Sequence, residues 1–471
     1  MFGLSLDLTI LLVLCLLAAC AFEFINGFHD TANAVATVIY TKSLKPTYAV
    51  VWSGMWNFLG VYVGGIAVAI GIINLLPIAA LVDQNSYHAI AMILALVITA
   101  ILWNLGTWYL GLPCSSSHTL IGSIFGVGIA YLLLPNVNEI ALNWTKVKDV
   151  GLSLLISPVI GFGLTLGLMA LLKKYIKNDI IFEENSKRKH PPFLIRIILI
   201  LTCTSVSFSH GSNDGQKGVG LIMIILIGLI PAKFAIDKTK SPEQLYEKVV
   251  LIEESLSKVD SVNLNIEDKI ICRLLIDKTK NIKSIITGVA NFNEIKGTQN
   301  FQLRKDILEL SKETNKLLSN SFDEPSISLT KTEISHLKKN IASIKTFTEY
   351  SPWWVILMIS VSLGLGTMIG WKRIVITVGE KIGKTPLTYA QGASAELVAA
   401  ATIQMASAFG LPVSTTHVLS SGVAGSMVAQ KGLKNLRMKT VRNILVAWLI
   451  TLPVTIVLSG AIFLLLRWAI G

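Results

Sequence analysis

Charged side chains are scarce in this chain. Lysine, arginine, aspartate and glutamate together make up 15% of its 471 residues, whereas 52% are hydrophobic and the mean hydropathy is +0.62. Most of a chain with this composition cannot form a water-soluble fold. We therefore expect an integral membrane protein.

Paired cysteines and an N-terminal basic cluster are also missing. The five cysteines show no paired spacing, so the sequence suggests neither a disulfide framework nor a metal cluster. The first residues lack the lysines and arginines that open a secretory signal, and their apolar run continues into the motif at Asp30. We expect an uncleaved first helix.

Long apolar runs are plentiful instead. A membrane-spanning helix needs about 20 mostly apolar residues. Runs of suitable length occur at residues 8–25, 47–76, 89–110, 150–172, 352–370, 388–409 and 441–466. These runs predict a multi-pass membrane protein.

The net charge of +12 falls in the loops between these runs. We interpret it as positive-inside topology with anionic lipid contact rather than as nucleic-acid binding. The basic loop at residues 173–192 is therefore predicted to be cytoplasmic. An interruption before Asp214 in the apolar stretch 193–231 predicts that the chain enters the membrane and returns, which places the next polar block in the cytoplasm. The side of residues 371–386 stays open.

Two motifs occur twice, in the same order. Gly-Phe-His-Asp at residues 27–30 returns as Gly-Ser-Asn-Asp at 211–214, and Gly-Leu-Pro-Cys-Ser-Ser-Ser-His at 111–118 returns as Gly-Leu-Pro-Val-Ser-Thr-Thr-His at 410–417. The first pair is 184 positions apart and the second 299, so the second half holds 115 more residues between its motifs. Internal duplication is typical of secondary transporters. The predicted parts are a first transmembrane repeat at 1–172, the basic loop at 173–192, the start of the second repeat at 193–231, a soluble helical insert at 232–350 and the rest of the second repeat at 351–471.

The insert is polar, with apolar residues such as Val249, Ile252 and Leu256 at helical spacing. Similar periodicity at residues 266–289, 301–318 and 327–347, with a break at 323–325, predicts four packed helices. The insert contains no pattern that resembles a nucleotide-binding loop or a catalytic cluster. A regulatory or structural role is therefore favoured over an enzymatic one.

Ionisable groups inside apolar segments mark the candidate site. An unpaired carboxylate at Asp30 or Asp214 would cost at least ~2.5 kcal/mol in the membrane, so such residues usually bind something. The alternative for either residue alone is a helix cap at a glycine break. Further donors and acceptors crowd the same turns: Asn26, His29, Asn33, His210 and Asn213. The pattern predicts a cation or proton site that faces an anion site.

Two more charges lie in apolar segments. Lys217 follows Asp214 by three residues and either pairs with it or contacts a substrate. Glu396 has no acidic counterpart in the first half, where Asn57 is the nearest candidate. This asymmetry points to a role for Glu396 in coupling.

The second motif indicates how an anion could be held. Pro113 and Pro412 suit the first turn of a helix, and the hydroxyls that follow lie beside free backbone N–H groups, an arrangement that binds oxyanions. These hydroxyls belong to Ser115, Ser116, Ser117, Ser414, Thr415 and Thr416. Close packing of small residues between helices is the alternative for either run alone. His118 and His417 either orient the hairpins or carry a proton, and orientation is favoured.

Two rival functions are less well supported. An intramembrane hydrolase built on Ser117 and His118 would need neighbouring side chains that point in different directions to act as a pair, and a hydrolase needs only one nucleophile. A passive anion channel would not need buried carboxylates. Dependence of uptake on a proton gradient would separate a channel from a transporter.

The motifs resemble the inorganic phosphate transporter (PiT) family, and most closely its bacterial low-affinity phosphate permeases. The resemblance rests on residues 26–34, residues 210–218 and the paired Leu-Pro-x-Ser-[Ser/Thr]-[Ser/Thr]-His hairpins, and it covers residues 1–231 and 351–471. It implies an all-α, polytopic protein of the inner (plasma) membrane with two inverted repeats, broken helices and re-entrant hairpins, plus the helical soluble insert. It also implies a transporter rather than an enzyme.

The resemblance further implies site roles and partners. Phosphate would be held by Asn33, Asn213 and the six hairpin hydroxyls, and cations or protons by Asp30, Asp214 and Glu396. Sodium-coupled relatives carry a glutamate in each repeat, so Asn57 in this chain favours proton symport, with hydrogen phosphate moving as a neutral complex with a divalent metal. Sodium-coupled phosphate or sulfate transport is the alternative. Membrane lipids are expected partners. We expect no nucleic-acid partner, no cofactor and no fixed metal site. Whether the protein forms a homodimer is left open.

Overall fold

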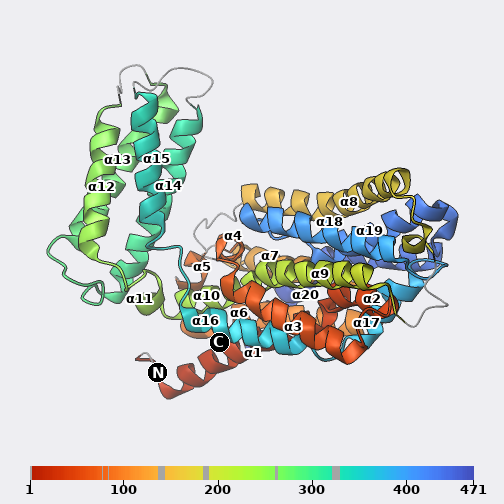
Figure 1. Cartoon of the computed structure of the whole chain (residues 1–471). Helices are drawn as coiled ribbons and strands as arrows, with labels where there is room; N and C mark the ends of the chain where they lie inside the picture. Colours follow the sequence, from red (N-terminus) through yellow and green to blue (C-terminus); the bar gives the residue numbers. More distant parts are fainter. Residues whose placement is uncertain are drawn as a thin grey trace. The chain divides into compact units, whose positions relative to one another are not determined.

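We describe a computed structural model of the chain, which covers residues 3–76, 78–82, 84–135, 144–183, 190–259, 264–320 and 329–470 (Figure 1). Apart from an isolated bridge between Gly383 and Leu436, the regular elements of these residues are all helices. The predicted all-α class is confirmed. The chain forms two compact units, one of Gly3–Ile225 with Ser351–Gly471 and the other of Leu226–Tyr350.

The first unit contains the helices of both sequence halves. In the first half these are α1 (Leu6–Asp30), α2 (Ala32–Tyr40), α3 (Pro46–Val63), α4 (Ala67–Ile73), α5 (Ala79–Val82), α6 (Ser86–Tyr109), α7 (Ser116–Leu132) and α8 (Trp144–Tyr175). In the second half they are α9 (Phe193–His210), α10 (Gln216–Leu229, whose residues after Ile225 belong to the second unit), α16 (Trp353–Thr367), α17 (Lys372–Ile376), α18 (Tyr389–Ala408), α19 (Thr415–Lys431) and α20 (Met438–Ile470). Five of the described helices are long and apolar enough to cross a membrane, and seven spans result if each bent pair counts as one.

The bent pairs occur at the same place in each half. α3 and α4 meet at an angle of 73°, and α16 and the segment Lys372–Lys381 meet at 56°. The predicted apolar run at residues 47–76 therefore forms a bent pair, because the chain turns sharply between α3 and α4, and this pair is either one broken span or a re-entrant loop. The predicted run at residues 388–409 forms α18, which is not among the helices that qualify as spans.

α9 and α10 contradict the prediction that the chain turns back at residues 210–214. They are joined by a π-helical turn at Gly211–Gly215 and form a 37-residue helix, Phe193–Leu229, about 55 Å long at 1.5 Å per residue. The chain therefore does not turn back at these residues, and the cytoplasmic side of the insert stays a prediction. Residues 184–189 of that loop lie outside the described residues.

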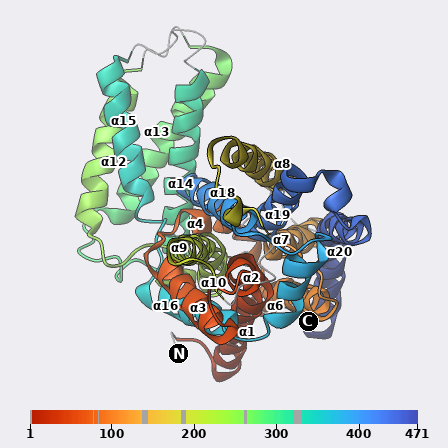
Figure 2. The ribbon, with the colours of Figure 1, turned by 45° about the vertical axis from the view of Figure 1, so that its right-hand side comes forward.

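The hairpin helices pack across the two halves. α19 of the second half lies against α8 of the first, and α7 of the first half lies against α20 of the second (Figures 1 and 2). α16 of the second half likewise contacts α1 and α3 of the first half. This exchange brings motifs from distant parts of the sequence together, while the inverted orientation of the repeats remains a prediction.

The second unit contains the four predicted helices of the insert. α12 (Pro242–Ser257), α13 (Ile266–Ile286), α14 (Gly297–Asn320) and α15 (Lys331–Lys345) follow a short helix, α11 (Pro231–Phe234), and enclose an apolar core. α12 packs on α13 and α15, and α14 packs on α13 and α15. The predicted break at residues 323–325 lies outside the described residues.

The two ends of the insert are tied to each other. The backbone N–H of Asp237 donates to the carbonyl of Phe347 at 2.8 Å. The buried guanidinium of Arg304 donates to the carbonyls of Ala235 and Thr348, at 3.2 and 2.5 Å. Burial lowers the pKa of Arg304 to about 10, which leaves the side chain charged at neutral pH. The insert therefore begins and ends at one point.

Candidate functional site

The two hairpin helices begin at equivalent places because the helices before them end in the same way. Gly111 and Gly410 adopt left-handed conformations, with φ of 67° and 65°, which favour glycine and end α6 and α18. α7 and α19 then start three residues after Pro113 and Pro412. The prediction that these prolines occupy the first helical turn is wrong, since both lie in the non-helical link.

Two of the six predicted phosphate hydroxyls serve as helix caps. Ser115 Oγ accepts a hydrogen bond from the backbone N–H of His118 at 3.1 Å, and Ser414 Oγ accepts one from His417 at 3.2 Å. The rings of His118 and His417 pack on each other, with centroids 4.6 Å apart. This contact joins the first turns of the two hairpin helices, which fits the orienting role favoured for these histidines.

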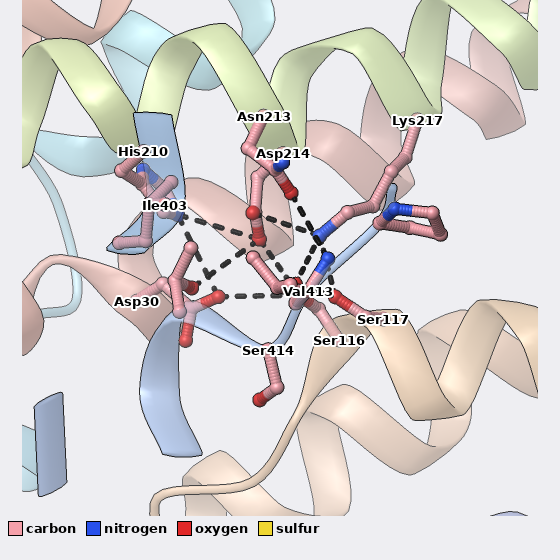
Figure 3. A network of polar contacts seen from close by, with 12 residues as sticks. Asp30, Ser116, Ser117, His210, Asn213, Asp214, Lys217, Ile403, Val413 and Ser414 are labelled. Atoms are coloured by element: carbon pink, nitrogen blue, oxygen red, sulfur yellow. Dashed lines mark hydrogen bonds and ion pairs between the residues drawn. The ribbon is translucent and has the colours of Figure 1, made fainter. Parts of the chain in front are cut away.

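The two buried aspartates meet at one hydroxyl. Ser116 Oγ lies 3.1 Å from Asp30 Oδ2 and 3.3 Å from Asp214 Oδ2, within donating distance of both (Figure 3). His210 Nε2 lies 3.6 Å from each of the same two oxygens. His29 Nδ1 lies 3.3 Å from Asp30 Oδ1. Residues that are far apart in the sequence thus form one polar cluster inside the membrane unit.

The second hairpin reaches the same carboxylates. Thr416 Oγ1 donates to Asp30 Oδ1 at 2.6 Å and accepts from Asn33 Nδ2 at 3.2 Å. Thr415 Oγ1 lies 3.5 Å from Asp214 Oδ2. The N-terminal turns of α7 and α19 therefore converge on the aspartates, and the donors of two helix N-termini lie at one point.

Lys217 is fully enclosed in this cluster. Its Nζ lies 2.7 Å from Asp214 Oδ1, so the predicted ion pair is present, and it also donates to Ser117 Oγ and, at 3.3 Å, to the carbonyl of Val413. Ser117 Oγ donates to the same carbonyl at 2.8 Å. These contacts link α10 to both hairpins.

Three of the predicted site residues lie beside the cluster and hold its parts. Asn213 donates to Ser407 Oγ at 2.9 Å and accepts from the backbone N–H of Val413 at 3.4 Å, which fixes the second hairpin. Asn57 Oδ1 lies 2.9 Å from His210 Nδ1. Glu396 accepts a hydrogen bond from Thr202 Oγ1 of α9 at 2.6 Å.

The pairing of Asn57 with Glu396 is not supported by the fold. Asn57 lies on α3, whose equivalent in the second half is the bent α16, whereas Glu396 lies on α18, which precedes the hairpin as α6 does in the first half. The two residues are therefore not counterparts, and the argument that Asn57 disfavours sodium coupling loses its basis.

Sequence reasoning missed Glu23. This residue of α1 is fully buried, its Oε2 accepts from Asn26 Nδ2 at 3.1 Å, and its Oε1 has no hydrogen-bond partner among the described residues. It packs against Gly218, where an added Cβ would come within 2.3 Å of Glu23 Cγ. An acid inside the apolar run at residues 8–25 was the available signal.

The cluster also offers ligands for a metal ion. Asp30, His210 and Asp214 are buried and each present one ligand atom, and these atoms all lie within 4.8 Å of one another. Carboxylate oxygens with one imidazole nitrogen suit divalent cations such as Mn²⁺ or Zn²⁺ better than a monovalent ion.

Comparison with known protein families shows which family the chain belongs to. A model of a phosphate transporter family matches residues 26–459. The chain belongs to the phosphate transporter family. Its members are integral membrane transporters rather than enzymes, so the predicted family, membrane location and non-enzymatic class are confirmed.

Individual relatives match the transporter over nearly its whole length. The low-affinity inorganic phosphate transporter of Buchnera aphidicola subsp. Acyrthosiphon pisum is 42% identical and aligns over 98% of this chain and 97% of its own. PitB of Escherichia coli, also a low-affinity inorganic phosphate transporter, is 41% identical over 98% and 97%. A solved structure of a sodium-dependent phosphate transporter matches 97% of this chain and 99% of its own with a TM-score of 0.53, and at 19% identity it indicates a shared fold only.

Proposed function

We propose that this protein imports inorganic phosphate together with a divalent metal ion, by proton symport. Phosphate as the substrate is supported by relatives that are 40–42% identical and named low-affinity inorganic phosphate transporters. Ser116, Ser117, Thr415 and Thr416 hold the phosphate, and Asp30, Asp214 and His210 hold the metal.

The contact of both aspartates with the single hydroxyl of Ser116 carries this proposal. A phosphate that accepts from this hydroxyl meets the carboxylates of Asp30 and Asp214 and one ammonium, that of Lys217. Like charges about 4 Å apart repel by roughly 4 kcal/mol at an effective dielectric constant of 20. Phosphate therefore binds here only when a further cation lies between it and the carboxylates.

The surroundings of His210 favour a metal as that cation. Asn57 Nδ2 donates to Thr367 Oγ1 at 2.9 Å, which turns Asn57 Oδ1 toward His210 Nδ1. His210 Nδ1 then carries the hydrogen, and Nε2 faces the two carboxylates, where its lone pair can bind a metal. In this proposal Asn57 orients His210, and it does not stand in the place of a coupling glutamate.

Glu23 and Glu396 supply the proton-carrying groups of the proposal. Both are fully buried, and neither has an ion-pair partner within the described part of the chain. A carboxyl group without a cationic partner is more stable in its neutral form in apolar surroundings, so each can take up a proton in one conformation and release it in another. Sodium coupling is the alternative, and sulfate is the alternative anion.

Uptake into proteoliposomes tests the proposal. Radiolabelled phosphate is supplied with Mg²⁺ or Mn²⁺ or with a chelator, under an imposed pH gradient or an imposed sodium gradient. We expect uptake that requires the metal, follows the pH gradient and is not reduced by excess sulfate. Undiminished uptake in chelator would exclude transport of phosphate as a metal complex. Uptake driven by a sodium gradient alone would show that sodium, not the proton, is the coupling ion.

Two histidine variants sharpen this test. His210→Gln removes the proposed metal ligand and should abolish metal-dependent uptake. His190→Gln is the matched control, because His190 is exposed and its Nδ1 lies 3.3 Å from the carbonyl of Lys42, away from the two aspartates. Equal loss in both variants would mean that the effect is not one of metal binding.

A further inference from the structure

Lys217 occupies the position in the second half that Asn33 occupies in the first. Asn33 follows Asp30 by three residues, and Lys217 follows Asp214 by three. Their contacts correspond as well: Lys217 donates to Ser117 of the first hairpin, and Asn33 donates to Thr416 of the second, at the equivalent hairpin position. The two positions therefore correspond, with an ammonium in the second half where the first has a neutral amide.

The ammonium of Lys217 lies among oxygen atoms of three kinds. These are the carboxylate of Asp214, the hydroxyl of Ser117 and the backbone carbonyl of Val413 (Figure 3). Carboxylate, hydroxyl and carbonyl oxygens at an irregular helical turn are the ligands with which membrane transporters coordinate small cations. The side chain is 2% exposed. Lys217 thus places a positive charge where a bound cation could lie.

The three donors of this ammonium are all used within the protein. A lysine ammonium has three N–H groups, and three oxygen acceptors surround Lys217 Nζ. A direct hydrogen bond to phosphate would require the loss of one of these contacts. The geometry therefore favours a charge that balances Asp214 over a ligand of phosphate.

The first half has the acceptors without the ammonium. Asp30 accepts from Thr416, and Asn33 uses its amide N–H₂ on the same hydroxyl. Asn33 Oδ1 is buried and has no hydrogen-bond donor among the described residues. A buried acceptor without a donor is costly unless a ligand satisfies it.

We infer that Lys217 is a tethered cation. Its ammonium permanently fills, in the second half, a position equivalent to one that an exchangeable monovalent cation can enter beside Asn33. The inference rests on the proposed function, because it assumes that phosphate binds beside Asp30 and Asp214. One consequence is that each phosphate needs one free cation fewer than it would if both halves carried asparagine.

Exchange of Lys217 for the residue found in the first half tests the inference. Binding of inorganic phosphate to purified protein is measured by calorimetry at fixed pH and fixed Mg²⁺, in choline chloride and in sodium chloride. Lys217→Asn should weaken phosphate binding in choline by about tenfold or more, and sodium should restore it. Lys217→Met, which offers no oxygen to a cation, should be weakened without restoration by sodium.

A double variant tests the equivalence of the two positions. Asn33→Lys combined with Lys217→Asn moves the ammonium to the first half and should restore phosphate binding in choline. Wild-type affinity of folded Lys217→Asn in choline would overturn the inference, and so would equal restoration of Lys217→Met by sodium or a double variant that binds phosphate in choline as weakly as Lys217→Asn.

The wild-type protein supplies a measurement that needs no variant. If the substitutions prevent folding, as judged by gel filtration, the sodium dependence of wild-type phosphate binding decides. A first-order dependence supports the inference. A higher order would require two exchangeable sites, and no dependence would leave the position beside Asn33 without sodium, so either result would overturn the inference. Failure of wild-type protein to bind phosphate would instead refute the proposed function.

Discussion

Removal of the Ser116 hydroxyl is a direct test of the proposed phosphate site. This hydroxyl lies 3.1 and 3.3 Å from oxygens of the two aspartates, whereas the equivalent hydroxyl of Thr415 makes one contact, at 3.5 Å. Loss of one hydrogen bond to a charged group costs about 1.5 to 3 kcal/mol, or more than about tenfold in affinity. We expect Ser116→Ala to weaken phosphate binding by at least this factor and Thr415→Ala to weaken it less.

Matched controls lie on the same two helices. Ser123 of α7 and Ser426 of α19 are buried, and their hydroxyls donate to backbone carbonyls of their own helices, at 2.8 and 2.7 Å. Ser123→Ala and Ser426→Ala should leave the phosphate dissociation constant of purified protein nearly unchanged. If Ser116→Ala behaves like Ser123→Ala, the hydroxyl does not reach phosphate and the hairpins serve only packing. Because the donors share one ligand, Ser116→Ala and Thr415→Ala need not be additive.

Three further predictions concern the carboxylates and the insert. Asp30→Asn and Asp214→Asn should each abolish concentrative uptake without preventing membrane insertion, since a neutral side chain is easier to insert; normal uptake at wild-type expression would remove that aspartate from the mechanism. Replacement of residues 238–346 by a short linker should leave a transporter that binds phosphate and elutes as folded protein, because the flanking backbone groups are 2.8 Å apart; aggregation of the product would contradict this. Hydrogen bonds from Thr330 and an ion pair with Lys258 lower the pKa of Glu333 to about 2. The stabilising contribution of Glu333 is therefore present above pH 4.5 and is lost as the pH falls toward 2. The melting temperature of purified insert carrying Glu333→Gln should fall less over this range than that of the unsubstituted insert.

The duplicated motifs were the strongest guide to the site. The sequence predicts that Asp30 and Asp214 act together because each ends the same four-residue motif, and the two share a hydroxyl in the structure. The sequence could not distinguish the hydroxyls that face this cluster from Ser115 and Ser414, because all six lie in equivalent runs. A helix cap can be recognised only when the first residue of the helix is known. Here each helix starts three residues after the proline that the sequence places in its first turn.

Glu23 was missed for a different reason. A single acid in an apolar run does not change the hydropathy of a window of about 20 residues, so the run was interpreted as a simple span. Only the fold brings Glu23 against Gly218 of α10, next to Lys217 in the chain. Conversely, Asn57 and Glu396 were paired by their rough order in the sequence, and the bend between α3 and α4 shows that they belong to different elements.

The glycines near Asp214 suggested a break, yet they serve close packing of helices. A Cβ on Gly211 would come within 2.2 Å of the Asn57 carbonyl oxygen, and one on Gly60 within 2.2 Å of the Phe208 carbonyl oxygen. α3 and the π-helical turn can approach this closely only where both lack side chains. The same approach brings Asn57 Oδ1 to His210 Nδ1 and turns Nε2 toward the aspartates. Local rules interpret these glycines as a turn. In this fold they instead allow the close helix packing that orients His210, the proposed metal ligand.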